Sequence, residues 1–301
     1  EDRAVAQEST RRNLARRELA WLRRGAPART RKSKSRIERA RKLMAEQGFV
    51  RPKVAEFQLA APPRLSAVVL EGEGLTKRFG DLVANDDISL ALHAGEVLAL
   101  LGENGAGKST LMSILFGHYV ADAGQTEVFG RALPPGDTRA ALAAGVGMVH
   151  QHFTLADNLP VLDNVMLGTE GLGGLVTRRA QALARLQAVA LRSGLTVPAH
   201  ARVASLSVGE RQRVEILKAL YRGARVLVLD EPTAVLTPQE SQSLFVTLRQ
   251  LVAQGMAVIF ISHKLDEVLR VSDRIAVLRA GRLVATMAVC DTTKSALAEV
   301  M

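Results

Sequence analysis

A glycine-rich loop that ends in a lysine and two hydroxyl residues is the segment of this chain best suited to hold phosphate. It runs from Gly102 to Thr110 as Gly-Glu-Asn-Gly-Ala-Gly-Lys-Ser-Thr, between the apolar run Val97–Leu101 and an amphipathic stretch. Glycines let backbone N–H groups approach phosphate oxygens, because bulky side chains would block that approach. The amphipathic stretch predicts a helix from about Lys108, whose positive dipole end faces the same anion.

The end of this loop supplies the charged and metal-binding groups. Lys108 is expected to reach the β- and γ-phosphates of a nucleotide, and the Ser109 hydroxyl to ligate Mg²⁺. The strand–loop–helix context favours this interpretation over a glycine-rich turn without a ligand. The nucleotide-binding residues predicted in the loop are Gly102, Asn104, Gly105, Gly107, Lys108, Ser109 and Thr110.

Two adjacent acids follow a second apolar run. Val226–Leu229 has the pattern of a strand buried on both faces of a parallel sheet, and Asp230 and Glu231 come directly after it. Unpaired buried carboxylates are costly, and a cation relieves that cost. Ligand sites of doubly wound sheets lie at the carboxyl ends of their strands. We therefore expect Asp230 to hold Mg²⁺ through water, and Glu231 to polarise the attacking water.

Two further segments complete an ordered set of four. Leu206-Ser-Val-Gly-Glu210 opens a helical stretch, and Ser262-His263 closes the apolar run Ala257–Ile261. In this order, the segments resemble the ATP-binding cassette (ABC) ATPases, from about residue 67 to about residue 285. The resemblance implies an enzyme that hydrolyses ATP with Mg²⁺. It also implies an α/β fold, a P-loop NTPase of ABC type with an antiparallel β subdomain and a helical subdomain.

The resemblance implies roles for three more side chains. Phe79 matches the aromatic that stacks on adenine, although an ordinary strand-end aromatic is the alternative. Gln151 matches the glutamine that contacts Mg²⁺ and senses the membrane partner. His263 matches the histidine that touches the γ-phosphate; taken alone, it would be a hydrogen-bonded core histidine. The implied catalytic residues are Glu231, His263 and Gln151, and the implied metal-binding residues are Ser109, Gln151 and Asp230.

In the family, the segment 206–210 covers the nucleotide of the opposite subunit, so that two domains sandwich ATP. Ser207 and Gly209 are the residues expected to do this, and Ser207 is also suited to cap the following helix. The segment departs from the commonest family wording, with Val208 for glycine and Glu210 for glutamine. Thr237 stands where many relatives carry aspartate. The replacement of aspartate by Thr237 bears on communication between two ATP sites and not on nucleotide binding.

The sequences of two segments resemble one branch of the family, the ATPases of simple-sugar and nucleoside importers. These segments are residues 233–240, Thr-Ala-Val-Leu-Thr-Pro-Gln-Glu, and 261–267, Ile-Ser-His-Lys-Leu-Asp-Glu. Such ATPases usually carry two cassettes, and this sequence ends at Met301, after the wording of the first. The implied partners are a second ABC ATPase domain, identical or not, and membrane permease subunits. The implied location is cytoplasmic, peripheral on the inner face of the cell membrane.

The charge of the chain is concentrated at its start. Residues 1–60 carry 17 Lys and Arg and seven Asp and Glu, whereas residues 61–301 carry 23 of each. The segment 17–30 resembles the inter-cassette linker of ABC-F ATPases, which are soluble translation factors. Basic arms suit phosphate backbones, so RNA or the ribosome is a possible partner of residues 1–60. A solvated, partly disordered basic segment is the alternative.

The predicted organisation is a basic helical, linker-like segment over residues 1–62 and a nucleotide-binding domain over 63–301, with a helical subdomain at about 153–222. The catalytic part resembles the importers and the first part ABC-F, so three interpretations stay open: an importer ATPase, an ABC-F-like factor acting on the ribosome, or a chimera without a cognate partner. A single cysteine, Cys290, excludes a disulfide framework. No apolar run approaches the roughly 18 residues that a membrane span needs.

The elements that must position these residues can also be predicted. Helices are expected at 8–24, 36–47 and 178–193, and antiparallel strands at 67–75 and 88–92. Parallel core strands are expected at 97–101, 146–149, 226–229 and 257–261. A final hairpin is expected from 274–278 and 282–285.

Overall fold

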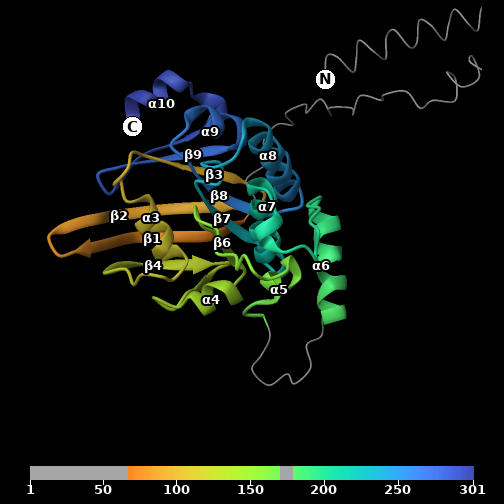
Figure 1. Ribbon diagram of the computed structural model, residues 1–301. Coiled ribbons are helices and arrows are strands. Elements are labelled where there is room, and N and C mark those ends of the chain that lie inside the picture. Colours follow the sequence, from red (N-terminus) through yellow and green to blue (C-terminus); the bar gives the residue numbers. More distant parts are fainter. Residues whose placement is uncertain (1–66, 170–178) are drawn as a thin grey trace, which may run out of the picture. The chain divides into compact units, whose positions relative to one another are not determined.

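Two β-sheets organise the residues that the computed structural model describes, 67–169 and 179–301 (Figure 1). The first sheet has the order β2-β1-β4-β5 and is antiparallel. The second has the order β10-β9-β3-β8-β7-β6, and its strands from β9 to β6 run parallel. The α/β class with an antiparallel subdomain is therefore confirmed. The predicted helices at 8–24 and 36–47 and the boundary at residue 62 lie outside the described residues.

The antiparallel sheet is built on a long hairpin. Its strands are β1 (Val68–Phe79), β2 (Leu82–His93), β4 (Ala123–Val128) and β5 (Arg131–Ala132). β1 begins one residue after the predicted start at 67, β2 contains the predicted 88–92, and both strands extend beyond the predictions towards the turn at residues 80–81. This extension was missed because polar residues such as Asp86 and Asp87 interrupt the apolar alternation from which strands are predicted. β4 was not predicted at all, since residues 123–125 are exposed and the strand begins Ala-Gly-Gln.

The parallel strands appear where the apolar runs predicted them. They are β3 (Val97–Leu101), β6 (Val146–Val149), β7 (Val226–Asp230) and β8 (Ala257–Ile261). β9 (Arg274–Arg279) and β10 (Arg282–Ala288) form the predicted hairpin at the sheet's edge. Apart from Asp230 at its end, β7 is fully buried, as expected for a central strand.

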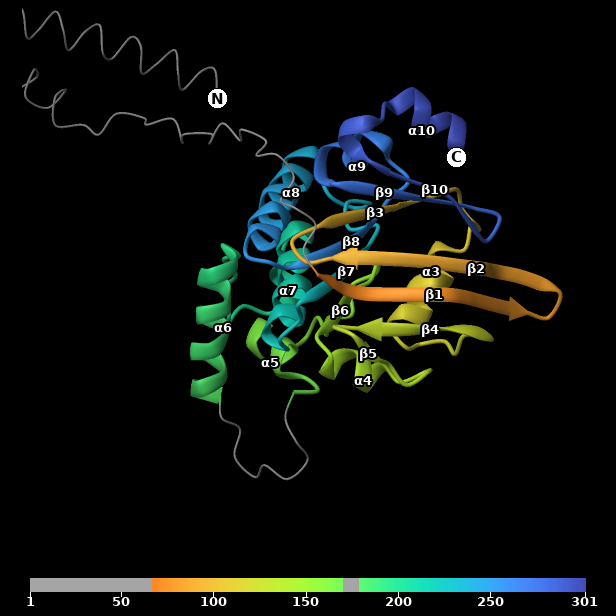
Figure 2. The ribbon, with the colours of Figure 1, turned by 180° about the vertical axis from the view of Figure 1, so that it is seen from behind.

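Alternate residues of the parallel strands face two different hydrophobic clusters. Val97, Ala99 and Leu101 pack with the helices on one face, among them α7 and α8. Leu98 and Leu100 pack with α3 and with β1 and β2 on the other face. Figure 2 shows this layering from behind, with the long hairpin and α3 on the side opposite α7 and α8. Because both faces are covered, polar groups on these strands are accommodated at the strand ends.

The helices connect the strands and cover the sheet. They are α3 (Lys108–Leu115), α4 (Thr138–Ala143), α5 (Val161–Met166), α6 (Arg179–Ser193), α7 (Val208–Tyr221), α8 (Pro238–Ala253), α9 (Leu265–Val271) and α10 (Lys294–Val300). Short 3₁₀ turns span Val203–Ser205 and Val289–Asp291. The predicted helix at 178–193 corresponds to α6, and the predicted helical segment 153–222 contains α5, α6 and α7.

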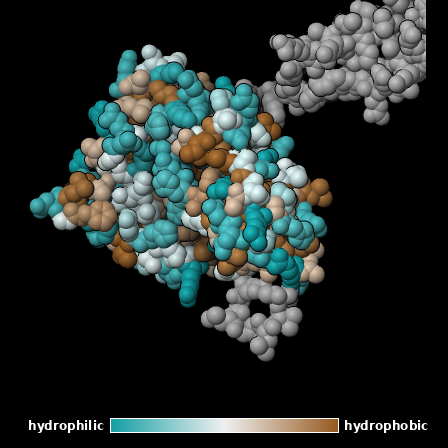
Figure 3. Space-filling view, in the orientation of Figure 1, coloured by the Kyte–Doolittle hydropathy of each residue, from teal (hydrophilic) through white to brown (hydrophobic). Residues whose placement is uncertain are grey.

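Exposed hydrophobic side chains are scattered over the described surface. On the face shown in Figure 3 they lie in small separate groups. The most exposed is Leu191 on α6, followed by Leu82 in the long hairpin. Among the described residues, no helix is both long and apolar enough to cross a bilayer.

Candidate functional site

The strand register brings the ends of three neighbouring strands to one level. Ile261 of β8 pairs with Leu100 of β3 on one side and with Asp230 of β7 on the other. The chain therefore leaves the sheet into three adjacent loops, which carry the glycine-rich segment, Glu231 and His263. Parallel pairing places all three loops at the same edge of the sheet, so residues about 130 and 30 positions apart in sequence face one site.

The glycine-rich loop joins β3 to α3 as predicted, and two of its glycines are sterically required. Gly102 has φ 154° and Gly107 has φ 98°, a range that favours glycine. A Cβ at Gly102 would clash with the Leu278 carbonyl oxygen, and one at Gly107 would clash with that of Ala84. The loop is thus packed closely against neighbouring backbone, and its shape depends on these two positions.

A buried asparagine that was not predicted from the sequence supports this loop from β2. Asn85 is fully buried, and its Nδ2 donates to the Gly107 carbonyl at 3.1 Å. The turn between β9 and β10 adds a second support, since the Gly281 N–H donates to the Ala106 carbonyl at 3.2 Å. An asparagine in an alternating strand carries no signal for this role, because the contact spans 22 residues.

Lys108 is buried and held inside the loop that it terminates. Its Nζ donates to the carbonyls of Gly102, at 2.7 Å, and Glu103, at 2.9 Å. Burial lowers the pKa of Lys108, and the nearby carboxylates Glu231 and Asp230 oppose that shift. An ammonium with neutral partners in a partly desolvated site is well suited to attract a phosphate anion.

The two acids at the end of β7 share the same surroundings. Burial raises the pKa of Asp230, the Glu231 carboxylate raises it further, and His150 and Lys108 counteract the shift. The ionised pair is therefore unfavourable by itself, which is the condition that a bound cation relieves. Glu231 adopts φ 42°, an uncommon backbone conformation for glutamate that costs on the order of 1–3 kcal/mol.

His263 and Glu231 contact each other across the two strand ends. The His263 Nδ1 lies 3.0 Å from Glu231 Oε1, and the Glu231 N–H donates to the Ile261 carbonyl at 3.1 Å. The His263 side chain is half-exposed, whereas that of Glu231 is mostly buried. Two of the three predicted catalytic side chains thus contact each other at strand ends adjacent to the one that leads into the glycine-rich loop.

Most of the remaining predicted residues of this edge are exposed. Gln151 follows β6, and the pairing of Val149 with Leu229 places it near the level of Glu231. Asn104 and Gly105 lie at the outer side of the loop, and Ser109 lies in the first turn of α3. Thr110, next to it, is half-buried.

Oxygen groups of the kind that Mg²⁺ prefers are present at this edge. The Ser109 hydroxyl, the Gln151 amide and the Asp230 carboxylate are hard oxygen donors, and Asp230 has its pKa raised by burial. Among the described residues, no group of three or more His, Cys, Asp or Glu side chains is arranged to hold a metal ion by itself. This donor set fits an ion held by few protein groups together with substrate phosphates, which is how Mg²⁺ is usually bound.

Phe79 ends β1 with its ring exposed and faces an aromatic residue that was not predicted. Its ring lies edge-on to Tyr119, with centroids 5.6 Å apart. The ion pair between Lys77 and Asp122, 2.9 Å long, joins the same two segments. Lys77 Nζ lies over the Phe79 ring, 5.6 Å from its centroid, and the residue is 45% exposed. The adenine-binding role stays a prediction.

Ser207 and Gly209 lie at the start of α7, and their contacts differ from those of the loop. The Ser207 hydroxyl accepts from the Glu210 N–H at 3.2 Å, and the Glu210 carboxylate accepts from the Ser207 N–H at 2.8 Å, a reciprocal capping box. The Gly209 N–H donates to Glu240 at 3.2 Å. Among the described residues, no hydrogen bond or ion pair links these two residues to the glycine-rich loop.

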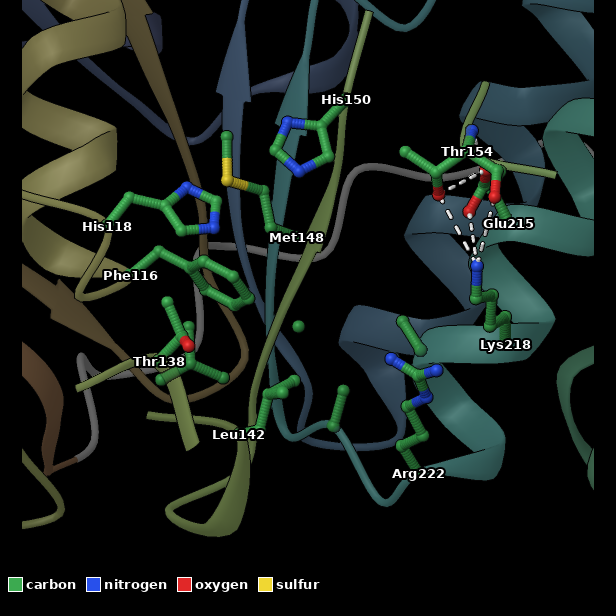
Figure 4. A pocket seen from close by; sticks show the side chains of 14 residues that line it. Phe116, His118, Thr138, Leu142, Met148, His150, Thr154, Glu215, Lys218 and Arg222 are labelled. Carbon is green, nitrogen blue, oxygen red and sulfur yellow. Dashed lines mark hydrogen bonds and ion pairs between the residues drawn. The ribbon is translucent and has the colours of Figure 1, made fainter. Parts of the chain in front are cut away.

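A cavity of about 230 Å³ lies beside the end of β6 (Figure 4). On one side, the rings of His118 and His150 stack with centroids 5.8 Å apart. On the opposite side, the cavity is lined by Lys218 of α7 and by Arg222, the residue that follows α7. The buried Glu215 there accepts from the Thr154 N–H and hydroxyl. The cavity borders the strand end that leads into Gln151, so an occupant would lie next to the predicted site.

Residues 85–234 of the chain match the family described as "ABC transporter". Over 77% of its length the chain is 46% identical to the nucleoside import ATP-binding protein NupA of Lactococcus lactis. Over the same share it is 44% identical to the glucose import ATP-binding protein TsgD13 of Haloferax volcanii. It is also 48% identical to the ribose import ATP-binding protein RbsA 1 of Burkholderia thailandensis. The chain spans 46–47% of the length of these relatives.

Solved structures share the fold. MJ1267, an ATP-binding cassette of an ABC transporter, matches with a TM-score of 0.70 at 24% identity, covering 78% of this chain and 99% of that one. The ATP-binding cassette MJ0796, in a dimeric post-hydrolysis state with ADP and Pi, matches with a TM-score of 0.60 at 24% identity, covering 73% of this chain and 98% of that one. At such identities the likeness establishes the fold.

Proposed function

Because the chain belongs to the ABC transporter ATPase family, we propose that it binds and hydrolyses ATP as the nucleotide-binding domain of an importer for nucleosides or simple sugars. The observation that carries the proposal is the meeting of Lys108, Glu231 and His263 at three adjacent strand ends, with Glu231 and His263 3.0 Å apart. The substrate class rests on the nucleoside, glucose and ribose importers among its relatives.

The proposed mechanism assigns one task to each group of the chain. The N–H groups of the loop and the first turn of α3 bind the phosphates, together with Lys108, which exchanges its bonds to Gly102 and Glu103 for phosphate oxygens. Ser109, Gln151 and Asp230 would hold Mg²⁺, which neutralises phosphate charge when bound. Glu231 orients the attacking water and accepts a proton from it. His263 contacts the γ-phosphate and keeps Glu231 in place.

We propose that the second half of the site comes from another cassette. Ser207 is exposed at the positive end of α7, and within residues 67–169 and 179–301 no hydrogen bond or ion pair links it to the glycine-rich loop, so its hydroxyl is available to a nucleotide on a second domain. The dimeric state of MJ0796 is a precedent for such an arrangement in one cassette of this fold. The partner is a second copy or a different ABC ATPase domain.

Membrane attachment is proposed to come through permease subunits at the inner face of the cell membrane, which would make the protein cytoplasmic and peripheral. The cavity between the histidines and α7 supports this, because it is lined by His150, the residue before Gln151, and by the cations Lys218 and Arg222 (Figure 4). Burial lowers the pKa of Lys218, so an acidic group from a partner would be favourable there. The helical subdomain at about 153–222 would provide one wall.

The experiment is MgATP hydrolysis by the purified chain, alone and co-expressed with a permease of the nucleoside-importer class. Hydrolysis that depends on Mg²⁺, together with co-purification of the permease, is expected. Absence of ATP binding would contradict the ATPase proposal, and sedimentation with ribosomes instead of the permease would contradict the importer proposal. The ribosome-acting alternative rests on residues 1–60, outside the described residues, and nothing in the comparisons supports it.

The domain boundary is proposed at residue 62. Residues 61–301 carry equal numbers of acidic and basic side chains, so the cassette does not need the charge of the preceding segment. A chain that begins at residue 63 should keep the ATP affinity of the full chain. A loss of affinity with an intact circular-dichroism spectrum would place the boundary earlier.

A further inference from the structure

Glu267, in the first turn of α9, joins the two loops that carry Glu231 and His263. One carboxylate oxygen, Oε2, accepts from the Thr233 hydroxyl at 2.5 Å and from the Ser262 hydroxyl at 3.3 Å. The other, Oε1, lies 3.1 Å from Lys264 Nζ. Thr233 lies two residues after Glu231, and Ser262 lies one residue before His263, so a single side chain connects both loops.

The contacts of Glu267 are shielded from solvent. Thr233 and Ser262 are each 2% exposed, and the Glu267 side chain is 15% exposed. Removing a partner from such a network leaves a desolvated polar group, which costs more than the loss of an exposed hydrogen bond. The geometry of the two loops is therefore coupled to the carboxylate between them.

Lys264 strengthens the same connection from the other side. Its Nζ also lies 3.4 Å from the Thr233 carbonyl, and its N–H donates to the Ser262 hydroxyl at 3.1 Å. The lysine ammonium lies on Oε1, the carboxylate oxygen that does not accept from the two hydroxyls, so the two oxygens of Glu267 together have three side-chain partners. In the part of the chain that the structure describes, no hydrogen bond or ion pair links Glu267 or Lys264 to the glycine-rich loop.

The backbone of Glu231 requires such support. It adopts φ 42°, and its N–H is bound to the Ile261 carbonyl, which precedes Ser262. Uncommon conformations of this kind persist when surrounding contacts over-determine them. The network formed by Thr233, Ser262, Lys264 and Glu267 begins two residues after Glu231. It fixes the loop that follows β7 on the side of Glu231 away from the strand.

We propose that Glu267 is a positioning residue, whose carboxylate ties the loop after β7 to the loop after β8 and so holds Glu231 and His263 in contact. The proposal rests on the proposed ATP hydrolysis, because the contact matters for activity only if these two side chains act on ATP. It predicts that weakening the tie reduces turnover and leaves nucleotide binding, which depends on the loop 102–110, nearly unchanged.

The first measurement does not depend on activity. The ring resonances of His263 are recorded by NMR in the full chain labelled at histidine, and assigned with His263→Gln. In Glu267→Gln they should move towards their positions in Glu231→Ala, in which the contact is deleted. In Asp266→Asn, whose exposed carboxylate pairs with Lys294 on the surface, they should stay in place. Unmoved resonances in Glu267→Gln would overturn the proposal.

The second measurement separates positioning from a purely structural role. Glu267→Gln and Thr233→Val should each lower kcat about tenfold, the equivalent of one hydrogen bond to a charged group, with the KM for ATP within about twofold. Thr233→Ser, which keeps the hydroxyl, should restore kcat, and the double variant Thr233→Val/Glu267→Gln should fall no further than the lower single variant. Equal losses of kcat, ATP affinity and thermal midpoint would show a structural role and overturn the proposal. A wild-type chain without hydrolysis would contradict the proposed function, and the NMR result would still decide the positioning role.

Discussion

Two regions of this chain present N–H groups and hydroxyls suited to an anion, and they differ in what completes them. At the ends of β3, β7 and β8, side chains from separate segments contact each other, as His263 and Glu231 do. At the start of α7, Ser207 contacts its own first turn, and Gly209 contacts Glu240 of the neighbouring helix. The first region is assembled within one chain. We infer that the second acts on a nucleotide held by another.

The largest expected effect concerns the first region. Lys108→Ala removes the buried ammonium, which would make two charge-assisted hydrogen bonds of about 1.5–3 kcal/mol each with the phosphates. ATP affinity should fall by about 10²-fold or more, measured by equilibrium titration. Lys294→Ala, which removes an exposed lysine paired with Asp266, is the control and should bind ATP normally. Equal ATP affinities of Lys108→Ala and the wild type would show that the loop does not bind the phosphates.

The second prediction separates binding from hydrolysis in the same region. Glu231→Gln keeps the shape of the side chain and a partner for His263 but removes the carboxylate that orients water. Turnover should fall by about 10²-fold or more while ATP still binds, measured by phosphate release and by titration. Turnover within a few-fold of wild type would assign the base to another residue.

The third prediction addresses the second region. Ser207→Ala removes a hydroxyl that is expected to reach the partner's nucleotide, so turnover should fall about tenfold with ATP affinity per chain unchanged. It also removes a helix cap, which costs about 1 kcal/mol. Thr293→Ala removes a cap of the same kind from α10 and is the matched control for that cost. If both variants lost turnover equally, Ser207 would be a cap and nothing more.

The smallest effect is on stability and reverses the usual sign for a site residue. The pKa of Asp230 is raised above its unfolded value, so its ionised form costs stability at pH values above the raised pKa, and the cost disappears as pH falls through it. Asp230→Asn should therefore raise the thermal midpoint of the nucleotide-free protein at pH 7, and the gain should shrink towards pH 4. A lower midpoint than wild type at pH 7 would contradict this electrostatic picture.

The sequence was sufficient where chemistry and pattern coincide in one segment. The loop 102–110, the buried run 226–229 and the pair Asp230 and Glu231 each carry their own signal, because glycines, a lysine or two acids follow a short apolar strand. The placement of the parallel strands followed from the same runs. Register then determined which loops meet, and register is not visible within a single strand.

The sequence was insufficient where a role depends on a contact between distant segments. Asn85 and Tyr119 have ordinary neighbours in the chain, and their partners Gly107 and Phe79 lie 22 and 40 residues away. Glu267 was part of a family wording, yet its bond to Thr233 spans 34 residues and appears only when β7 and β8 are adjacent. Such supporting contacts have no local pattern to predict them.

The most direct test of the split site is the assembly state of Glu231→Gln with saturating MgATP, measured by sedimentation velocity of the full chain. ATP that binds but is not hydrolysed should hold two chains together, because the α7 start of each covers the nucleotide of the other. We expect a species of twice the monomer mass with MgATP, a monomer without it, and a monomer when Ser207→Arg is added. A Glu231→Gln chain that binds MgATP and remains monomeric would contradict the division of the site between two chains.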